Sequence, residues 1–243
     1  MRLDKYLADM GIGTRSELKK EIRKGNVTVD GSMIKDPGFQ VTDDMSVQYC
    51  GKPVQYETYS YYMLHKPAGV ISATEDQTQK TVIDLITENK RSDLFPVGRL
   101  DKDTEGLLLI TNDGPLAHKL LSPKHHVNKV YYARISGIVS AQDIKAFQDG
   151  LKVDESFTAM PADLKVLHTD PDTHTSEVEI TIQEGKFHQI KRMFQAVGME
   201  VLFLKRLQMG SLVLDPALSP GEYRRLTESE LQALQTYDKK GTL

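Results

Sequence analysis

The stretch Gly98-Arg99-Leu100-Asp101-Lys102-Asp103-Thr104-Glu105-Gly106, followed at once by Leu107-Leu108-Leu109-Ile110, decides how this chain folds. The four apolar residues predict a buried strand, and charged side chains crowd the segment directly before it. Charged side chains are rarely buried without partners, so this segment must lie at the rim of a core. A carboxylate at such a junction is held rigidly while it still reaches a substrate.

The composition indicates one or two folded domains with a substantial core. The chain has 243 residues, of which 39% are hydrophobic and 27% charged. The N-terminal residues are charged, and no apolar run approaches the ~18 residues that a membrane helix needs. A single cysteine, Cys50, excludes internal disulfides, and the histidines at 118, 125 and 126 lack the spacing of metal ligands. We therefore expect a cytoplasmic protein with no membrane, metal or cofactor.

The charge is unevenly distributed along the chain. The net charge of −3 argues against a protein that coats nucleic acid with bulk positive charge. Residues 1–24 and residues 184–206 nevertheless each carry a net charge of +3. These two segments are either local binding faces for a polyanion or ordinary solvated helix faces, and charge alone does not separate the two.

The first 48 residues predict a small domain of two helices and a hairpin. Apolar residues recur at helical spacing from Leu3 to Met10, and Thr14-Arg15-Ser16-Glu17 is typical of a capping box that opens a second helix ending at Gly25. Val27–Val29 and Ser32–Ile34 flank Asp30-Gly31, which predicts a tight hairpin. Residues 49–59 show little periodicity, and we expect a linker there.

A larger domain is expected over residues 60–235, followed by a C-terminal tail at 236–243. Strands are predicted at 62–64, 107–110, 130–135 and 178–182, and helices at 82–89, 115–121, 141–149 and 187–197. Strands and helices alternate without a regular repeat. The fold class is therefore α+β, with a mixed, mostly antiparallel sheet and flanking helices.

The predicted helix at 187–197 presents two opposite faces. Ile190, Met193, Phe194 and Val197 fall on one side, and His188, Lys191, Arg192 and Gln195 on the other. Because the apolar side packs inward, the cations are held in a fixed orientation.

Several blocks, in order, resemble the type A pseudouridine synthases of small-subunit ribosomal RNA. They are Arg-Leu-Asp-Lys (2–5) with Gly-Asn-Val-Thr-Val-Asp-Gly (25–31), similar to an S4-type RNA-binding domain; His-Lys-Pro-Ala-Gly-Val (65–70); Gly-Arg-Leu-Asp-Lys-Asp-Thr-Glu-Gly-Leu-Leu (98–108); Lys-Val-Tyr (129–131); Glu-Gly-Lys-Phe-His-Gln-Ile-Lys-Arg-Met-Phe (184–194); and Pro-Gly-Glu-Tyr-Arg (220–224). The resemblance covers roughly residues 1–235.

The resemblance implies a role for several residues. Asp101 is the catalytic aspartate, Tyr131 stacks on the target base, and Lys191 is the cation that pairs with the catalytic carboxylate. Arg99 helps to fill the gap left by the extruded nucleotide, and Arg192 and His188 join the substrate site. The N-terminal domain binds RNA through its cations, which are Arg2, Lys5, Arg15, Lys19, Lys20 and Arg23.

The implied reaction breaks the bond from N1 of uracil to C1′ of the ribose and joins C1′ to C5. One carboxylate suffices, acting as a nucleophile or as a base that abstracts a ribose proton. A uridine must be flipped out of its stack to be reached. On residue pattern alone, Asp101 could equally form a structural ion pair with Arg99 or Lys102.

The expected partner is 16S ribosomal RNA, either naked or in an assembling particle, and the expected state is a monomer. Two other functions stay open. One is a pseudouridine synthase for large-subunit ribosomal RNA, and the other is a non-catalytic protein that binds ribosomal RNA during assembly.

Overall fold

The structure, a computed structural model, describes residues 1–87 and 91–237. Most of the tail predicted at 236–243 and the end of the helix predicted at 82–89 lie outside the described residues. Within 82–89 the described part is a single 3-10 turn, η1 (Ile83–Leu85), so the helix prediction is wrong there. The side chain of Asp84 accepts hydrogen bonds from Thr81, which closes a turn, and the backbone is extended at Ile86.

The N-terminal unit consists of helices α1 (Leu3–Asp9) and α2 (Arg15–Arg23) and a four-stranded sheet. Its strands, in the order β2-β1-β3-β4, are β1 (Val27–Val29), β2 (Ser32–Met33), β3 (Val47–Tyr49) and β4 (Lys52–Val54). The predicted capping box is present at Thr14 and Glu17. Asp30 and Gly31 both have positive φ, 49° and 77°, as a two-residue hairpin turn requires.

The linker predicted at 49–59 is wrong for its first half. Strand β4 lies inside that range and pairs with β3. Tyr56 follows, and its hydroxyl donates to Asp9 while its ring lies 5.1 Å from that of Tyr6. The residues of this range are polar or typical of turns and show no hydrophobic periodicity. Only their contacts with the N-terminal unit identify them as part of it.

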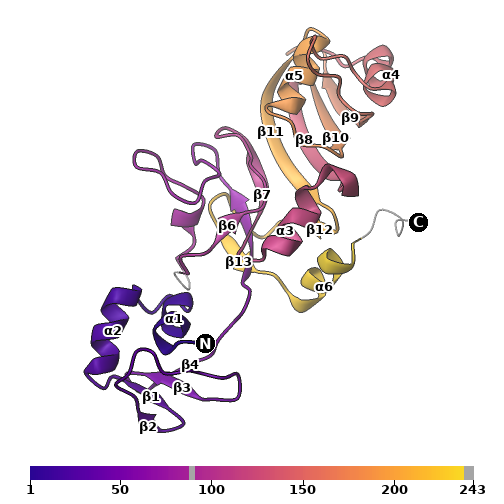
Figure 1. The fold of residues 1–243 in the computed structure, drawn as a ribbon. Helices are drawn as coiled ribbons and strands as arrows, with labels where there is room; N and C mark the ends of the chain where they lie inside the picture. The colour runs from indigo at the N-terminus through magenta and orange to yellow at the C-terminus, as the bar shows by residue number, and fades with distance from the viewer. Residues whose placement is uncertain (88–90, 238–243) are drawn as a thin grey trace.

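The second unit is built on a nine-stranded sheet (Figure 1). Seven strands follow the order β13-β5-β7-β11-β8-β10-β9, while β6 pairs with β7 and β12 with β11. Their bounds are β5 (Tyr61–Lys66), β6 (Phe95–Pro96), β7 (Glu105–Thr111), β8 (Lys129–Ser136), β9 (Asp163–Asp170), β10 (Thr175–Ile182), β11 (Glu200–Met209), β12 (Leu212–Val213) and β13 (Tyr223–Arg225). Only β7 and β11 pair in parallel among these strands, so the predicted mixed, mostly antiparallel sheet is confirmed.

Helices cover both faces of this sheet. One core contains α4 (Ala141–Asp149) and α5 (Gln189–Ala196), and the other contains α3 (Gly114–Leu121) and α6 (Glu228–Thr236). Leu108 and Ile110 of β7 belong to the first core, and Leu107 and Leu109 to the second. The apolar run that follows the charged segment is continuous because β7 is buried on both faces.

A short 3-10 turn, η2 (Pro123–His125), joins α3 to β8. The helices predicted at 115–121 and 141–149 and the strand predicted at 130–135 are confirmed as α3, α4 and β8. None of the described helices has both the length and the apolar content that crossing a membrane demands.

Candidate active site

Asp101 lies in a loop, residues 98–104, that leads directly into β7; we call it the Asp101 loop. The preceding residue, Leu100, is buried, and its backbone N–H and C=O both bond to the hydroxyl of Ser72. After it, the N–H of Thr104 donates to the carbonyl of Asp101 at 3.1 Å. The Asp101 side chain is 25% exposed and lines a cavity of about 70 Å³. The carboxylate is thus held at the junction of core and surface, as the sequence predicts.

Lys66 supports the Asp101 loop from inside the protein. The residue is fully buried, and its ammonium donates to the carbonyls of Pro67, Lys102 and Thr104 at 3.0, 3.2 and 2.8 Å. Burial lowers the pKa of Lys66 to about 8, against the opposing charges of the neighbouring carboxylates, of which Asp103 acts most strongly. Two of the three acceptors belong to the loop, so this one side chain fixes its path.

Gly106 lets the same segment join the sheet. It has a φ of 105°, and a Cβ placed there would lie 2.2 Å from the carbonyl oxygen of Arg206. Gly106 pairs with Arg206 in the parallel ladder of β7 and β11, and the Arg206 guanidinium donates to the carbonyl of Leu107 at 2.8 Å. Only glycine fits this close approach of two backbones.

Tyr131 forms another wall of the cavity. It lies in β8, only 7% exposed, and the cavity is lined beside it by Ile182 and Leu204. Tyr132 points to the other face of the sheet, where its ring packs on Phe203. The strand pattern alone leaves the choice between the two tyrosines open, and the fold places Tyr131 in the same cavity as Asp101.

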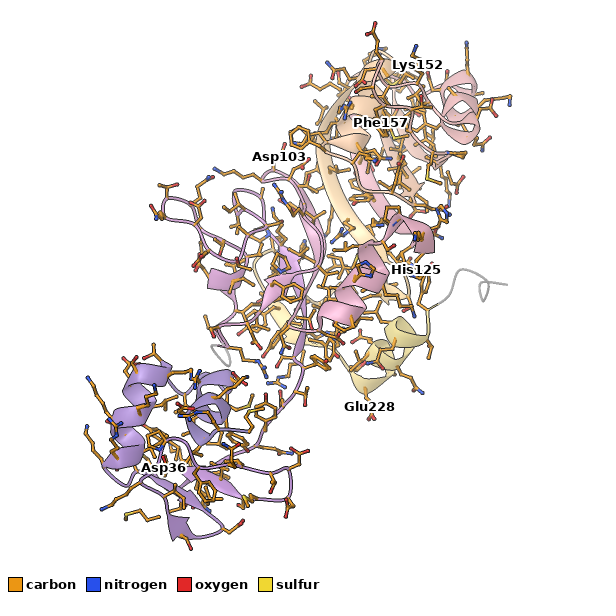
Figure 2. The ribbon with its side chains drawn as sticks, in the orientation of Figure 1. Asp36, Asp103, His125, Lys152, Phe157 and Glu228 are labelled. Atoms are coloured by element: carbon orange, nitrogen blue, oxygen red, sulfur yellow. The ribbon has the colours of Figure 1, made fainter. Side chains whose placement is uncertain are left out.

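Helix α5 brings Lys191 and His188 to the cavity. The ammonium of Lys191 lies 3.5 Å from a carboxylate oxygen of Asp101, and the ring of His188 lies 3.6 Å from the other oxygen. The hydrogen bonds of Lys191, however, go to Asp103, at 2.6 and 2.7 Å. Figure 2 shows Asp103 at the end of β7 that faces α5. Lys191 therefore lies close to Asp101, as predicted, but its hydrogen bonds are made to a second carboxylate, that of Asp103.

Sequence patterns alone do not single out Asp103, which has the character of a solvated turn residue. Partial burial would raise its pKa, but the hydrogen bond and the charge of Lys191 lower it below the usual value. Its place in the same charged run, two residues after Asp101, is the available signal, since the turn closed by the bond from the Thr104 N–H to the Asp101 carbonyl leaves both carboxylates near Lys191.

The two predicted arginines of this site differ in position. Arg99 is exposed and lines the cavity. Arg192 does not line it: its guanidinium pairs with Asp154 and lies over the ring of Phe157 at 5.0 Å. Arg192 faces away because helical spacing turns it about 100° from Lys191, toward the loop that carries Phe157.

The six predicted RNA-binding cations of the N-terminal unit fall into two groups. Arg2 and Arg15 both pair with the fully buried Asp4, at 3.1 and 3.0 Å, and Lys5 pairs with Asp9. The other three make no ion pair within the described part of the chain, and they all lie on α2; they are Lys19, Lys20 and Arg23. Arg2, Lys5 and Arg15 therefore stabilise the domain through ion pairs, whereas the charges of the other three cations are not neutralised by these ion pairs.

Within residues 1–87 and 91–237, no group of three or more histidine, cysteine, aspartate and glutamate side chains is placed to hold a metal ion.

Comparison with known proteins identifies the family of this chain. The profile of a family described as RNA pseudouridylate synthase matches residues 60–196, and the S4 domain profile matches residues 1–47. The chain belongs to the RNA pseudouridylate synthase family. It is accordingly an RNA pseudouridine synthase, an isomerase with an N-terminal S4 domain, and the resemblance seen in the sequence is confirmed.

Relatives resemble this synthase over nearly their full length. The protein named "Uncharacterized RNA pseudouridine synthase YtzG" of Bacillus subtilis is 49% identical over 236 residues, 96% of this chain and 98% of that protein. Ribosomal small subunit pseudouridine synthase A of Vibrio cholerae is 40% identical, covering 96% and 99% of the two chains. Ribosomal large subunit pseudouridine synthase B of Bacillus subtilis is 38% identical, covering 99% and 98%. A crystal structure of a pseudouridylate synthase, 35% identical, aligns with a TM-score of 0.67 over 96% of this chain and 99% of that one.

Proposed function

We propose that this synthase converts one uridine of the 16S RNA of the small ribosomal subunit to pseudouridine, with Asp101 as its catalytic residue. The observation that carries the proposal is the convergence of Asp101, Tyr131 and Lys191 on one cavity from three separate segments. A structural ion pair of Asp101 with Arg99 or Lys102 would not need the tyrosine or the helix α5 cation.

The proposed chemistry needs only the residues of the cavity. The N1–C1′ bond breaks, the uracil turns within the pocket, and C5 bonds to C1′; the proton on C5 is then lost and N1 gains one. Asp101 acts either as the nucleophile at C1′ or as the base that removes a ribose proton, and both roles require it to be ionised. The ammonium of Lys191 lies 3.5 Å from a carboxylate oxygen of Asp101, and in this proposal the Tyr131 ring packs against the base.

In this proposal RNA is bound by both basic regions. The target nucleotide has to leave its stack, which costs a few kcal/mol, and contacts to neighbouring phosphates and bases supply that energy. Of the six cations predicted for the S4 domain, Lys19, Lys20 and Arg23 are available, because Arg2, Lys5 and Arg15 are already paired within the domain. The enzyme is proposed to act as a monomer in the cytoplasm, which light scattering of the purified protein tests in part.

The similarity of large-subunit synthase B, 38% over 240 residues, favours large-subunit RNA as the second candidate. For the small subunit, the support is the 40% identity of synthase A over nearly the whole chain together with the His-Gln-Ile-Lys block at 188–191. One assay, with each RNA as substrate in turn, distinguishes the two candidate functions.

The test is tritium release from 5-tritiated uridine in 16S RNA, 23S RNA and small-subunit particles. We expect release from a 16S substrate by the wild type and none by Asp101→Asn, with RNA binding retained. Asp172→Asn, an exposed aspartate in the β9–β10 turn, is the matched control and keeps full activity. Release from 23S RNA alone would support the second candidate. Binding without release from any substrate would support a non-catalytic assembly protein.

A further inference from the structure

Phe187 is an exposed residue between two residues that line the active-site cavity, Lys186 and His188. It is 72% exposed, more than any other large apolar side chain among the described residues, and it belongs to none of the three cores. Single exposed apolar residues are common, so exposure alone carries no meaning. Its surroundings give this residue a specific task.

The phenyl ring of Phe187 is stacked on the imidazole of His188. The two ring centroids are 3.8 Å apart and the planes differ by 19°. The same imidazole lies 3.6 Å from the Asp101 carboxylate. Two stacked rings therefore lead from the solvent to the cavity where the uridine reacts.

The fold holds Phe187 in this outward position at a cost. His188 has a φ of 49°, and the left-handed conformation costs a residue with a side chain roughly 1–2 kcal/mol. Strain of this kind persists where neighbouring contacts enforce it, and it concentrates at functional sites. Here the buried Gln189 enforces it: its side chain accepts from the N–H of Lys186 at 3.0 Å and donates to Glu184 at 2.9 Å.

Cations surround the stacked pair. Lys186 is exposed and lines the cavity one residue before Phe187, and Lys191, in the first turn of α5, lines the same cavity. An aromatic face flanked by cations beside a pocket for one nucleotide is the arrangement with which proteins bind single-stranded nucleic acid. A protein partner would need a far larger apolar patch than one ring provides.

We propose that Phe187, backed by His188, is a stacking platform for the nucleobase next to the target uridine. The inference rests on the proposed function, since it assumes an RNA substrate whose uridine is flipped into the cavity. Flipping removes a stacking partner from the neighbouring base, and the phenyl ring replaces it. Because every base has a π-face, the platform contributes affinity at this position rather than sequence selectivity.

Binding is measured in the Asp101→Asn background, so that chemistry does not contribute, with the rRNA that releases tritium in the assay above. Phe187→Ala and Phe187→Leu are expected to bind about 5- to 100-fold more weakly, and Phe187→Trp within about threefold of the parent. Leu202→Ala removes another exposed apolar side chain, 47% exposed on β11, and leaves affinity unchanged. The salt dependence keeps its slope in all of them, because no phosphate contact is lost.

A second measurement reports stacking directly. The adenine analogue 2-aminopurine, placed at each position flanking the mapped uridine in turn, is quenched at one position by the parent and remains bright with Phe187→Ala. A Phe187→Leu protein that binds as tightly as the parent would overturn the proposal, since packing on His188 would then suffice. So would Phe187→Ala matching Leu202→Ala. If those results accompany normal tritium release by the wild type, the platform fails and the proposed function stands; absence of release from every RNA overturns both.

Discussion

Replacing Lys66 with methionine tests how the fold holds the Asp101 loop. Methionine has nearly the same length but donates no hydrogen bond, so the carbonyls of Pro67, Lys102 and Thr104 lose the ammonium that joins them. Hydrogen bonds from a charged donor contribute about 1.5–3 kcal/mol each. The substitution also removes a buried charge, and this second effect works in the opposite direction.

The size of the second effect follows from the pKa of Lys66, which burial lowers from 10.5 to about 8. One pKa unit corresponds to about 1.4 kcal/mol, so holding this lysine charged at pH 7 costs about 3 kcal/mol. Three lost hydrogen bonds outweigh that relief, and we expect the variant to be less stable at pH 7 by about 1 to 6 kcal/mol.

The pH dependence separates the two effects. Between pH 8 and pH 10.5 the unfolded chain binds more protons at Lys66 than the folded chain does, so the wild type gains stability as the pH rises. The Lys66→Met protein lacks this gain. Its deficit in the free energy of unfolding should therefore widen by about 2 to 3 kcal/mol from pH 7 to pH 10.

The assay is urea unfolding at pH 7, 8, 9 and 10, combined with tritium release at saturating RNA. Displacement of the Asp101 loop by about 1 Å should lower kcat by roughly 100-fold and leave RNA affinity little changed. Lys129→Met is the matched control: burial and the charge of Arg206 lower the pKa of Lys129 to about 8 as well, but its ammonium donates to the carbonyl of Val127, outside the loop. A Lys66→Met deficit that stays constant with pH, or a kcat equal to that of Lys129→Met, would refute the reasoning.

Three further predictions concern other parts of the chain. Gly106→Ala should destabilise the fold by more than about 2 kcal/mol, because its Cβ meets the backbone of β11, whereas Gly114→Ala, with nothing within 4 Å, should not; thermal unfolding distinguishes them. Arg224 and Glu230 form an ion pair with two hydrogen bonds, which lowers the pKa of Glu230 to about 2. Arg224→Met should therefore lower the free energy of unfolding by about 2 kcal/mol at pH 6, and this deficit should vanish as the pH falls from 4.5 toward 2. Arg23→Glu should weaken RNA binding and reduce its salt slope by about one, at unchanged kcat under saturating RNA.

Each of these three has a contrary outcome. Equal melting temperatures for the two glycine variants would mean that β7 and β11 separate easily at that point. A deficit of Arg224→Met that stays undiminished from pH 6 down to pH 2 would place its origin in lost packing rather than in the ion pair. An unchanged salt slope for Arg23→Glu would remove helix α2 from the RNA contacts.

The sequence by itself determined those elements whose residues carry a clear period or turn signal, whereas strands such as β9 and β11 were not predicted. The charged segment before Leu107–Ile110, the hairpin at Asp30-Gly31 and the alternation at 178–182 all fixed local structure, because turn geometry and burial period are properties of neighbouring residues. The sequence also identified the family and pointed to Asp101. It failed at 82–89 and 49–59, where side-chain bonds from Asp84 and pairing with β3 override local preference.

Only the tertiary structure decided which side chains meet. Lys191 lies near the carboxylates of both Asp101 and Asp103. Lys66 is buried beneath the Asp101 loop, and the guanidinium of Arg192 lies over the ring of Phe157. Each of these contacts joins residues from separate elements, and periodicity assigns a side chain to a face without saying what lies opposite. The physical reason is that a site among the central strands of a sheet is made by long-range pairing. Here the parallel contact of β7 with β11 brings the Asp101 loop, Tyr131 and helix α5 together.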